Sequence, residues 1–284
     1  MLEPIAIVDR KAHEPSSDFR ARAAVAESCF AVEAQRVLDT EVFWLAGVFL
    51  VIAVIYAAVG QAGASGYIAI MALFGVAPLA MKTTALALNL MVAAIGTAWF
   101  MKSGRLSWRH IYPFAVLGFP FSMLGGSIQL AEGVYYPIVG AILVLSALQM
   151  ARSVMKRSAG NVAPPRTPPF LAALATGALI GFVSGTTGTG GGVFLAPVIF
   201  AMRWGTAHQT AATTALYNLM NSAAALIGAY AYWDQIPASL PLWLAAVAVG
   251  GTVGAFVGSR YLSDRWLRGI LAALLLASGV KLLL

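Results

Sequence analysis

Residues 185–192 read Gly-Thr-Thr-Gly-Thr-Gly-Gly-Gly, and residues 60–66 read Gly-Gln-Ala-Gly-Ala-Ser-Gly. Both stretches belong to a longer internal repeat, because Thr-Thr-Ala-Leu follows each of them, at 83–86 and at 213–216. The repeat consists mainly of apolar, small and hydroxyl residues, which is typical of secondary transporters built from two similar halves. It predicts that a ligand is held where the two halves meet.

The composition predicts a protein embedded in a lipid bilayer, because 60% of the residues are hydrophobic and only 10% are charged. Beyond residue 42 the chain has three acidic residues, Glu132, Asp234 and Asp264, so this part is strongly basic. Its bases lie in short loops and form no patch interleaved with aromatic residues, which argues against a nucleic-acid partner. The expected partners are therefore lipid and a small anion, and the sequence leaves homo-oligomerisation open.

Apolar runs divide the chain after residue 42 into ten segments. Their approximate limits are 43–60, 64–77, 83–101, 111–131, 134–152, 170–186, 190–203, 210–232, 240–260 and 266–284. A helix needs about 20 residues to cross the hydrocarbon core, so the second segment of each half is too short to cross. We therefore expect an all-α polytopic membrane protein with two inverted repeats of about five segments, each containing a short broken or re-entrant helix.

The charges predict the domain order and the topology. We expect a polar or amphipathic extension over 1–42, a membrane repeat over 43–153, a proline-rich cytoplasmic linker over 154–169 and a second membrane repeat over 170–284. Three basic loops should face the cytoplasm, whereas the loops near Glu132 and Asp234 contain no base and should face outward. This placement makes the halves antiparallel. The side of the N-terminus depends on whether the first short segment crosses the membrane or only dips into it.

The glycine-rich stretches are the first candidate site. Glycine lets a ligand approach the backbone, and the short helix that follows offers unpaired N–H groups and a positive dipole end, which favour an anion. Glycine also allows close helix packing, the role assigned to small residues spaced by four in 118–126, 177–185 and 250–258. The residues expected to contact the anion are Gly60, Gln61, Gly63, Ser65, Gly66, Thr186, Thr187, Gly188, Thr189, Gly190, Gly191 and Gly192.

A second cluster of polar residues begins the third segment of each half. Hydroxyl and amide groups on apolar helices either bond neighbouring helices or face an aqueous cavity, and threonine also bonds to its own helix backbone. Lys82 either snorkels to the interface or attracts an anion, and His208 is either structural or a second attracting group. The other residues of this cluster are Thr83, Thr84, Asn89, Gln209, Thr210, Thr213, Thr214, Asn218 and Asn221.

Several function classes are disfavoured. No aspartate or glutamate lies within a predicted span, which argues against coupling to protons or sodium through a buried carboxylate. The glycine-rich stretches lack the spacing of a P-loop or of a dinucleotide fingerprint. Three scattered histidines and one cysteine provide neither a metal cluster nor a nucleophile with its base. We therefore expect no enzymatic activity, no cofactor and no metal site.

The glycine-rich run, the apolar stretch with Pro197 and Thr-Thr-Ala-Leu at 213–216 resemble the TauE/SafE family of sulfite exporters, also called the 4-toluene sulfonate uptake permease family. The resemblance covers about residues 43–284. It implies a bacterial inner-membrane protein that moves small sulfur-containing or carboxylated anions such as sulfite, sulfonates or sulfoacetate. The first half departs from the family pattern, because 60–66 lacks the triple glycine and the later proline.

The leading hypothesis is a secondary anion transporter that works by alternating access and exports its substrate. A non-transporting scaffold or accessory subunit, which would bind a partner through residues 1–42 and the basic loops, is the alternative from another class. An anion channel is the third hypothesis.

Overall fold

The computed structural model describes residues 40–58, 60–102, 104, 106, 108–156 and 166–260, with positions 272, 273, 276, 279, 280 and 283. The chain divides into two compact units, 1–44 and 45–284. Residues 1–39 of the expected extension, 157–165 of the expected linker and most of the last apolar run lie outside the described residues.

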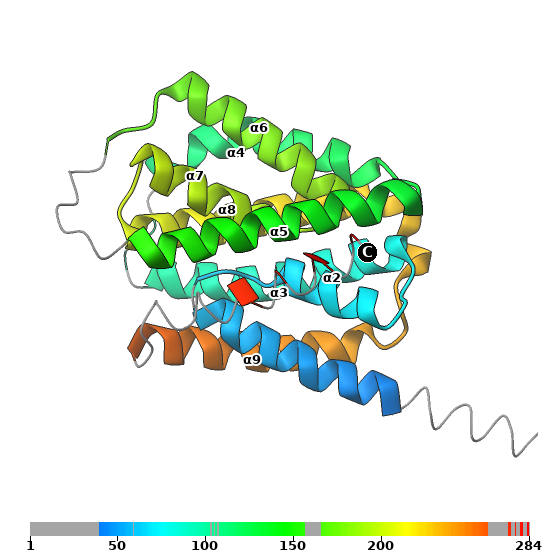
Figure 1. Ribbon diagram of the computed structural model, residues 1–284. Helices are drawn as coiled ribbons and strands as arrows, with labels where there is room; N and C mark the ends of the chain where they lie inside the picture. The colour runs from blue at the N-terminus through cyan, green and yellow to red at the C-terminus, as the bar shows by residue number, and fades with distance from the viewer. Residues whose placement is uncertain are drawn as a thin grey trace, which may run out of the picture. The chain divides into compact units, whose positions relative to one another are not determined.

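The described residues are mostly helical and contain no strand (Figure 1). A first helix spans Thr40–Ala58. The others are Ala64–Leu73 (α2), Pro78–Lys102 (α3), Trp108–Ser127 (α4), Glu132–Lys156 (α5), Phe170–Thr187 (α6), Gly192–Met202 (α7), Ala207–Gly228 (α8), the 3-10 helix Tyr230–Gln235 (η1) and Leu240–Arg260 (α9).

The lengths of these helices confirm the predicted all-α membrane fold. Within the described ranges, four helices are long and apolar enough to cross a membrane: Thr40–Ala58, Pro78–Lys102, Phe170–Thr187 and Leu240–Val257. The two predicted short segments form α2, with 10 residues, and α7, with 11 residues. Neither approaches the roughly 20 residues that a crossing helix needs. The order of a long helix, a short helix and two long helices occurs twice along the chain.

Small residues allow α4 and α6 to lie against each other, as Figure 1 shows. A Cβ atom on Gly177, Gly181 or Gly185 of α6 would collide with a backbone carbonyl oxygen of α4. These three glycines occupy one face of α6 because they are spaced by four residues. The packing role predicted for this glycine series is therefore confirmed.

The other two predicted packing series, in 250–258 and in 118–126, also bring backbones into contact. A Cβ atom on Gly250 or Gly254 of α9 would collide with a carbonyl oxygen of the helix Thr40–Ala58, at Leu50 or Val54 respectively. On α4, Gly126 meets the backbone of α8 at Ala225. Glycine thus brings three pairs of helices into backbone contact.

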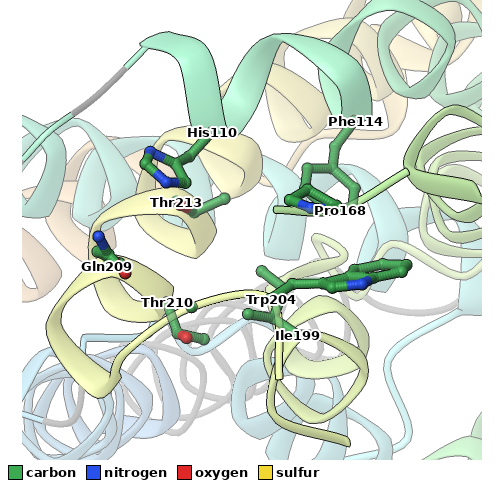
Figure 2. A pocket seen from close by; sticks show the side chains of 9 residues that line it. His110, Phe114, Pro168, Ile199, Trp204, Gln209, Thr210 and Thr213 are labelled. Carbon is green, nitrogen blue, oxygen red and sulfur yellow. The ribbon is translucent and has the colours of Figure 1, made fainter. Parts of the chain in front are cut away.

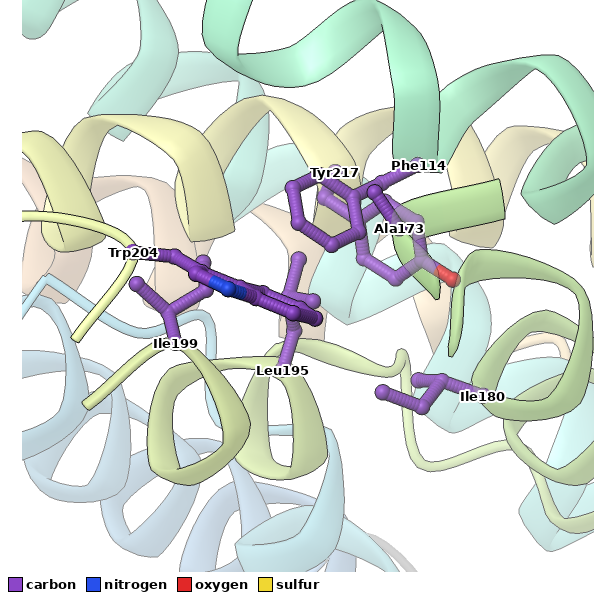
Figure 3. Packing of buried hydrophobic residues seen from close by; sticks show 7 residues of the cluster. All are labelled: Phe114, Ala173, Ile180, Leu195, Ile199, Trp204 and Tyr217. Atoms are coloured by element: carbon purple, nitrogen blue, oxygen red, sulfur yellow. The ribbon is translucent and has the colours of Figure 1, made fainter. Parts of the chain in front are cut away.

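An apolar core lies where α4, α6, α7 and α8 meet (Figure 3). The rings of Phe114 and Trp204 lie 5.9 Å apart between their centroids. Tyr217 is fully buried and donates its hydroxyl to the carbonyl oxygen of Gly177 at 2.7 Å, which satisfies the polar end of an otherwise apolar side chain. This core holds α7 against α8 and so positions the glycine-rich turn that precedes α7. Its members are Phe114, Ala173, Ile180, Leu195, Ile199, Trp204 and Tyr217.

Candidate functional site

The first glycine-rich stretch ends one helix and starts another. Gly60 has a φ of 76°, the Gly60 N–H donates to the Ala57 carbonyl, and the Gln61 N–H donates to the Tyr56 carbonyl. This pattern is a Schellman motif, which ends a helix at a left-handed glycine. Gly63, with a φ of 95°, then caps the N-terminus of α2. The stretch is therefore a sharp break between two helices.

The second stretch has the same arrangement. Gly188 has a φ of 79° and donates its N–H to the Ser184 carbonyl at 2.8 Å, which ends α6. Gly190 and Gly191 have φ values of 80° and 79°, a region that other residues rarely adopt, and α7 begins at Gly192. The predicted interruption of the helix is confirmed in both halves.

Two asparagines occupy equivalent positions against the two short helices. Asn89 of α3 accepts a hydrogen bond at Oδ1 from the Ala64 N–H, the first residue of α2, at 3.0 Å. Asn218 of α8 accepts at Oδ1 from the Gly192 N–H, the first residue of α7, at 2.7 Å. Each amide oxygen thus lies at the positive end of a helix dipole, where the backbone N–H groups favour negative charge. The match between the halves is one of geometry as well as of sequence.

The two asparagines also meet at Gly190. A Cβ atom there would collide with Asn89 Nδ2 and would lie 3.2 Å from Asn218 Oδ1. Asn89 Nδ2 donates to the Ser222 hydroxyl at 2.7 Å, a contact between residues 133 positions apart. Asn89 therefore links α2 of the first half to α8 of the second half, beside the glycine-rich turn.

A third asparagine and two serines extend this cluster. Asn221 donates from Nδ2 to the Ser184 hydroxyl at 3.2 Å, and the Ser122 hydroxyl donates to the Asn221 carbonyl at 2.9 Å. Asn221 Oδ1 is buried and has no hydrogen-bond partner among the described residues. A buried acceptor without a partner is uncommon, and a water molecule or another donor would complete it.

The predicted site omitted three serines, Ser122, Ser184 and Ser222, which the structure places in the cluster. Two of them could have been recognised from spacing. Ser222 lies four residues after Asn218 and therefore on the same helix face, and Ser184 directly precedes the glycine run. We define the central cluster as Asn89, Asn218, Asn221, Ser122, Ser184, Ser222 and the turn 188–192.

Most predicted threonines bond to their own helix backbone. Thr83, Thr186 and Thr214 each donate to carbonyl oxygens three and four residues earlier. Thr187 donates to the Val183 carbonyl at 2.7 Å, and its hydroxyl lies 2.9 Å from that of Thr189. These are the local bonds that threonine makes in apolar helices.

Two predicted threonines differ from the rest. The Thr84 hydroxyl is buried and has no partner among the described residues. Thr213 is 4% exposed and faces a recess at the end of α8 rather than the central cluster. The structure therefore separates Thr213 from Asn218 and Asn221, although all three lie on α8.

Lys82 is buried between the end of α4 and the glycine-rich turn. It is 3% exposed, and its ammonium group donates to the carbonyl oxygens of Gly125, Gly126 and Ile128 at 3.2, 2.8 and 2.8 Å. These carbonyls lie in the last turn of α4 and just after it, where the helix dipole is negative and a cation is stabilising. These contacts do not test the two predicted roles of Lys82, snorkelling to the interface and attracting an anion. The lysine lies directly under the Gly188 turn, because a Cβ atom on Gly188 would be 3.1 Å from the Lys82 Cα.

The remaining predicted residues of the first half either pack between helices or lie in the first glycine-rich turn. Ser65 is buried, and its hydroxyl lies 3.0 Å from that of Tyr56. Gly66 approaches the Ile52 side chain, so it serves packing. Gln61 is half-buried in the turn after the first helix. The side chain of His208 lies outside the described residues.

The buried polar groups are suited to an anion. Among the described residues, the buried polar side chains are serine, threonine and asparagine together with Lys82, and they include no carboxylate. Hydroxyl and amide groups donate hydrogen bonds without carrying charge, and the two short helices add backbone donors. An anion at this place would meet no opposing negative charge from the described residues.

A second feature is a recess beside the N-terminal ends of α4, α6 and α8 (Figure 2). It is partly open to the outside, and its cavity volume is about 10 Å³, which is room for about one water molecule. Apolar and polar side chains share its wall. The lining residues are His110, Phe114, Pro168, Ile199, Trp204, Gly205, Gln209, Thr210 and Thr213.

Comparison with known proteins agrees with this architecture. The family model described as "Sulfite exporter TauE/SafE" matches residues 45–282. The chain is 68% identical over 246 residues to "Probable membrane transporter protein y4hK" of Sinorhizobium fredii, an alignment that covers 87% of this chain and 100% of that protein. No solved structure matches the chain significantly. The chain therefore belongs to the TauE/SafE sulfite exporter family and is a multi-pass membrane transporter.

Proposed function

We propose that the chain is a secondary transporter in the bacterial inner membrane that exports small anions such as sulfite, sulfonates or sulfoacetate. The substrate is held at the central cluster, and the two halves form inverted repeats that move relative to each other for alternating access. The proposal rests chiefly on the matched contacts of Asn89 with the first amide of α2 and of Asn218 with the first amide of α7.

These contacts suggest how an anion is exchanged. In this conformation each asparagine oxygen occupies the position that an anion oxygen would take at the start of a short helix. An arriving anion replaces these amide oxygens at the Ala64 and Gly192 N–H groups. The displaced asparagines turn their Nδ2 groups toward the anion, since an amide side chain is both acceptor and donor. The helix ends are then satisfied with and without substrate.

The contacts also suggest why the two halves move together. Asn89 joins the first half to Ser222 of the second at 2.7 Å, and Gly190 packs between Asn89 and Asn218. A substrate that rotates either asparagine therefore changes a contact between the halves. Such a change provides the differential interaction that two alternating conformations require.

The substrate charge favours export. Each negative charge gains about 2.3 kcal/mol per 100 mV on moving outward across a membrane that is negative inside. The described spans bury no carboxylate that would couple transport to protons or sodium. Outward movement of an anion therefore needs no coupling ion.

The test is counterflow of labelled sulfite and sulfoacetate in proteoliposomes, with the wild type compared with Asn89→Asp and Asn218→Asp. The aspartate has nearly the same shape and still accepts the helix N–H, so the fold is preserved. Its negative charge opposes the substrate by about 4 kcal/mol at 4 Å, taking an effective dielectric constant of 20. Saturable exchange by the wild type should therefore fall at least a hundredfold in both variants.

The matched control is Gln149→Glu, which makes the same chemical change on the exposed side of α5. Exchange should be retained in this control. Unchanged exchange in both aspartate variants would refute the central cluster as the substrate site. Flux that does not saturate would favour the channel, and loss of cellular function on deleting residues 1–40, with no exchange of any anion tested, would favour the scaffold.

A further inference from the structure

Helices of the two halves make reciprocal contacts at the glycine-rich turns. Gly188, which ends α6, lies over Lys82 of α3, with 3.1 Å between a Cβ atom on Gly188 and the Lys82 Cα. Gly60, which ends the first helix, lies in the same way over Ala211 of α8, with 3.1 Å between a Cβ atom on Gly60 and the Ala211 Cβ. Lys82 and Ala211 each lie seven residues before the asparagine that accepts from a short helix. A reciprocal contact relates two equivalent surfaces, so Lys82 and Ala211 occupy equivalent positions.

Helices α3 and α8 run antiparallel beside the central cluster. Asn89 of α3 donates to Ser222 of α8. Eleven residues later on α3 and eleven residues earlier on α8, Phe100 and Ala211 both lie within 4 Å of a Cβ atom on Gly60. The start of α8 therefore lies beside the end of α3.

The two turns consequently flank the central cluster on opposite sides. Lys82 lies near the start of α3 and Ala211 near the start of α8, so they mark opposite ends of this helix pair. Seven residues correspond to about 10.5 Å along a helix, which separates each of them from the asparagine of its helix. We call these two ends the Lys82 end and the Ala211 end.

The Lys82 end is held by hydrogen bonds from a charged group. The Lys82 ammonium group donates to three carbonyl oxygens at the end of α4, at 2.8–3.2 Å. A Cβ atom on Gly125 of α4 would lie 2.8 Å from the Thr186 nitrogen, so the end of α4 packs on the last turn of α6. Tyr135 of α5 donates to the Thr187 carbonyl of the same turn at 3.0 Å. Lys82 thus joins α3 to the helices that surround the Gly188 turn.

The Ala211 end has a methyl group where the other end has an ammonium group. This methyl group faces Gly60 and cannot donate a hydrogen bond. The neighbouring residues Thr210 and Thr213 line the recess of Figure 2, which has room for about one water molecule. A contact between two small apolar groups is weak, whereas a hydrogen bond to a charged group contributes more. These contacts therefore hold the two ends closed with different strengths.

We propose that Lys82 is the latch of a gate: its three hydrogen bonds keep the Lys82 end closed and so set the balance between the two alternating conformations. Lys82 is a positioning residue, because it acts through the end of α4 and the Gly188 turn. The inference rests on the proposed function, which supplies the alternating access. The Lys82 end adjoins the loop near Glu132, which contains no base and is expected to face outward.

Opening at the Lys82 end requires the ammonium group to leave three carbonyl oxygens, whereas opening at Ala211 breaks no such bond. Removing the ammonium group therefore favours the conformation that is open at the Lys82 end. A purely structural lysine would instead stabilise both conformations equally, and its loss would leave their balance unchanged.

The experiment measures how fast a neutral thiol reagent, hydroxyethyl methanethiosulfonate, modifies one engineered cysteine in the full-length protein in nanodiscs. Cys29→Ser first removes the native cysteine. One reporter is Ala85→Cys on α3 and the other is Thr214→Cys on α8. Both positions are buried, and each lies four residues before the asparagine that binds the short helix, on the same helix face. Each rate is divided by that of the same cysteine in the unfolded protein.

The ratio of the Ala85→Cys rate to the Thr214→Cys rate measures the balance between the two open ends. In the background that retains Lys82, Ala85→Cys should react at least about tenfold more slowly than Thr214→Cys, because loss of one bond to a charged group corresponds to about tenfold. Lys82→Gln removes the charge, so the ratio should rise at least about tenfold. Lys82→Arg keeps the charge and the donors, so its ratio should rise less than that of Lys82→Gln.

The matched control is Gly254→Ala. A Cβ atom there would collide with the Val54 carbonyl oxygen, at a contact between α9 and the first helix that does not involve Lys82. This variant lowers stability without removing the latch, so its ratio should equal that of the background. General loosening of the fold raises both rates and leaves the ratio unchanged. Size-exclusion chromatography checks that the variants fold.

Either of two outcomes would overturn the proposal. The first is the same ratio in Lys82→Gln as in the background that retains Lys82. The second, which decides the result if Lys82→Gln does not fold, is equal rates for the two reporters in that background. Counterflow is measured separately. No exchange of any anion by the wild type would refute the proposed function, while the reporter ratio would still decide whether Lys82 holds one end closed.

Discussion

Replacing Gly181 by alanine tests whether close backbone contact between α4 and α6 stabilises the fold. A Cβ atom on Gly181 would collide with the Gly118 carbonyl oxygen and lie 3.0 Å from its carbon. The obstacle is backbone rather than a flexible side chain, so the helices must separate locally. Overpacking of this kind typically costs about 1–3 kcal/mol.

Gly96→Ala is the matched control, because Gly96 lies inside α3 and a Cβ atom there has nothing within 4 Å. Alanine is favoured over glycine in a helix by about 0.5–1 kcal/mol, and this gain applies equally to both substitutions. The difference between the two variants therefore isolates the packing term. We expect Gly96→Ala to be neutral or stabilising and Gly181→Ala to be less stable than it by about 1–3 kcal/mol.

The assay is thermal unfolding of the purified variants in one detergent, followed by intrinsic fluorescence. At roughly 2–4 °C for each kcal/mol, the apparent melting temperatures should differ by about 2–12 °C. Equal melting temperatures would show that α6 can move away from α4 at no cost. That result would refute the conclusion that the glycine series brings the two helices together.

Two further predictions concern buried polar groups. Lys82→Met should leave the Gly126 and Ile128 carbonyls without their donor, whereas the Gly125 carbonyl keeps the Ile128 N–H. We therefore expect a loss of at least about 2 kcal/mol, at about 1–3 kcal/mol for each unsatisfied group, measured in the same unfolding assay. Wild-type stability would show that water replaces the ammonium group. Thr84→Val removes a buried hydroxyl without a partner, so stability should be unchanged or should rise by up to about 1 kcal/mol. Counterflow should fall about tenfold if this hydroxyl contacts the anion, and unchanged counterflow would remove Thr84 from the residues predicted to contact it.

The helix interruptions were predictable from local sequence. Five glycines in residues 185–192 disfavour any continuous helix, and α7 accordingly begins at Gly192, after two left-handed glycines. The predicted limits of the short segments differ from α2 and α7 by a few residues. The start of α3 at Pro78 was missed, although proline suits the first turn of a helix.

The partners of the polar side chains were not predictable to the same degree. The sequence singled out Asn89, Asn218 and Asn221, but not the serines that bond two of them. The recess was also missed, because its histidine and its aromatic residues come from helices that are distant in sequence. The role of each threonine could not be predicted, because a threonine hydroxyl donates to its own helix backbone as readily as to a neighbouring group.

Sequence by itself determined the bilayer environment, the two short helices and the glycine faces, because hydropathy, helix length and four-residue spacing are properties of contiguous residues. Only the tertiary structure decided that the Lys82 ammonium group binds carbonyls at the end of α4, that Asn89 donates to Ser222 and that Thr213 faces a separate recess. The physical reason is that a hydrogen-bond partner depends on which helices cross and at what rotation. Backbone contacts at glycines determine that crossing, and they join residues far apart along the chain.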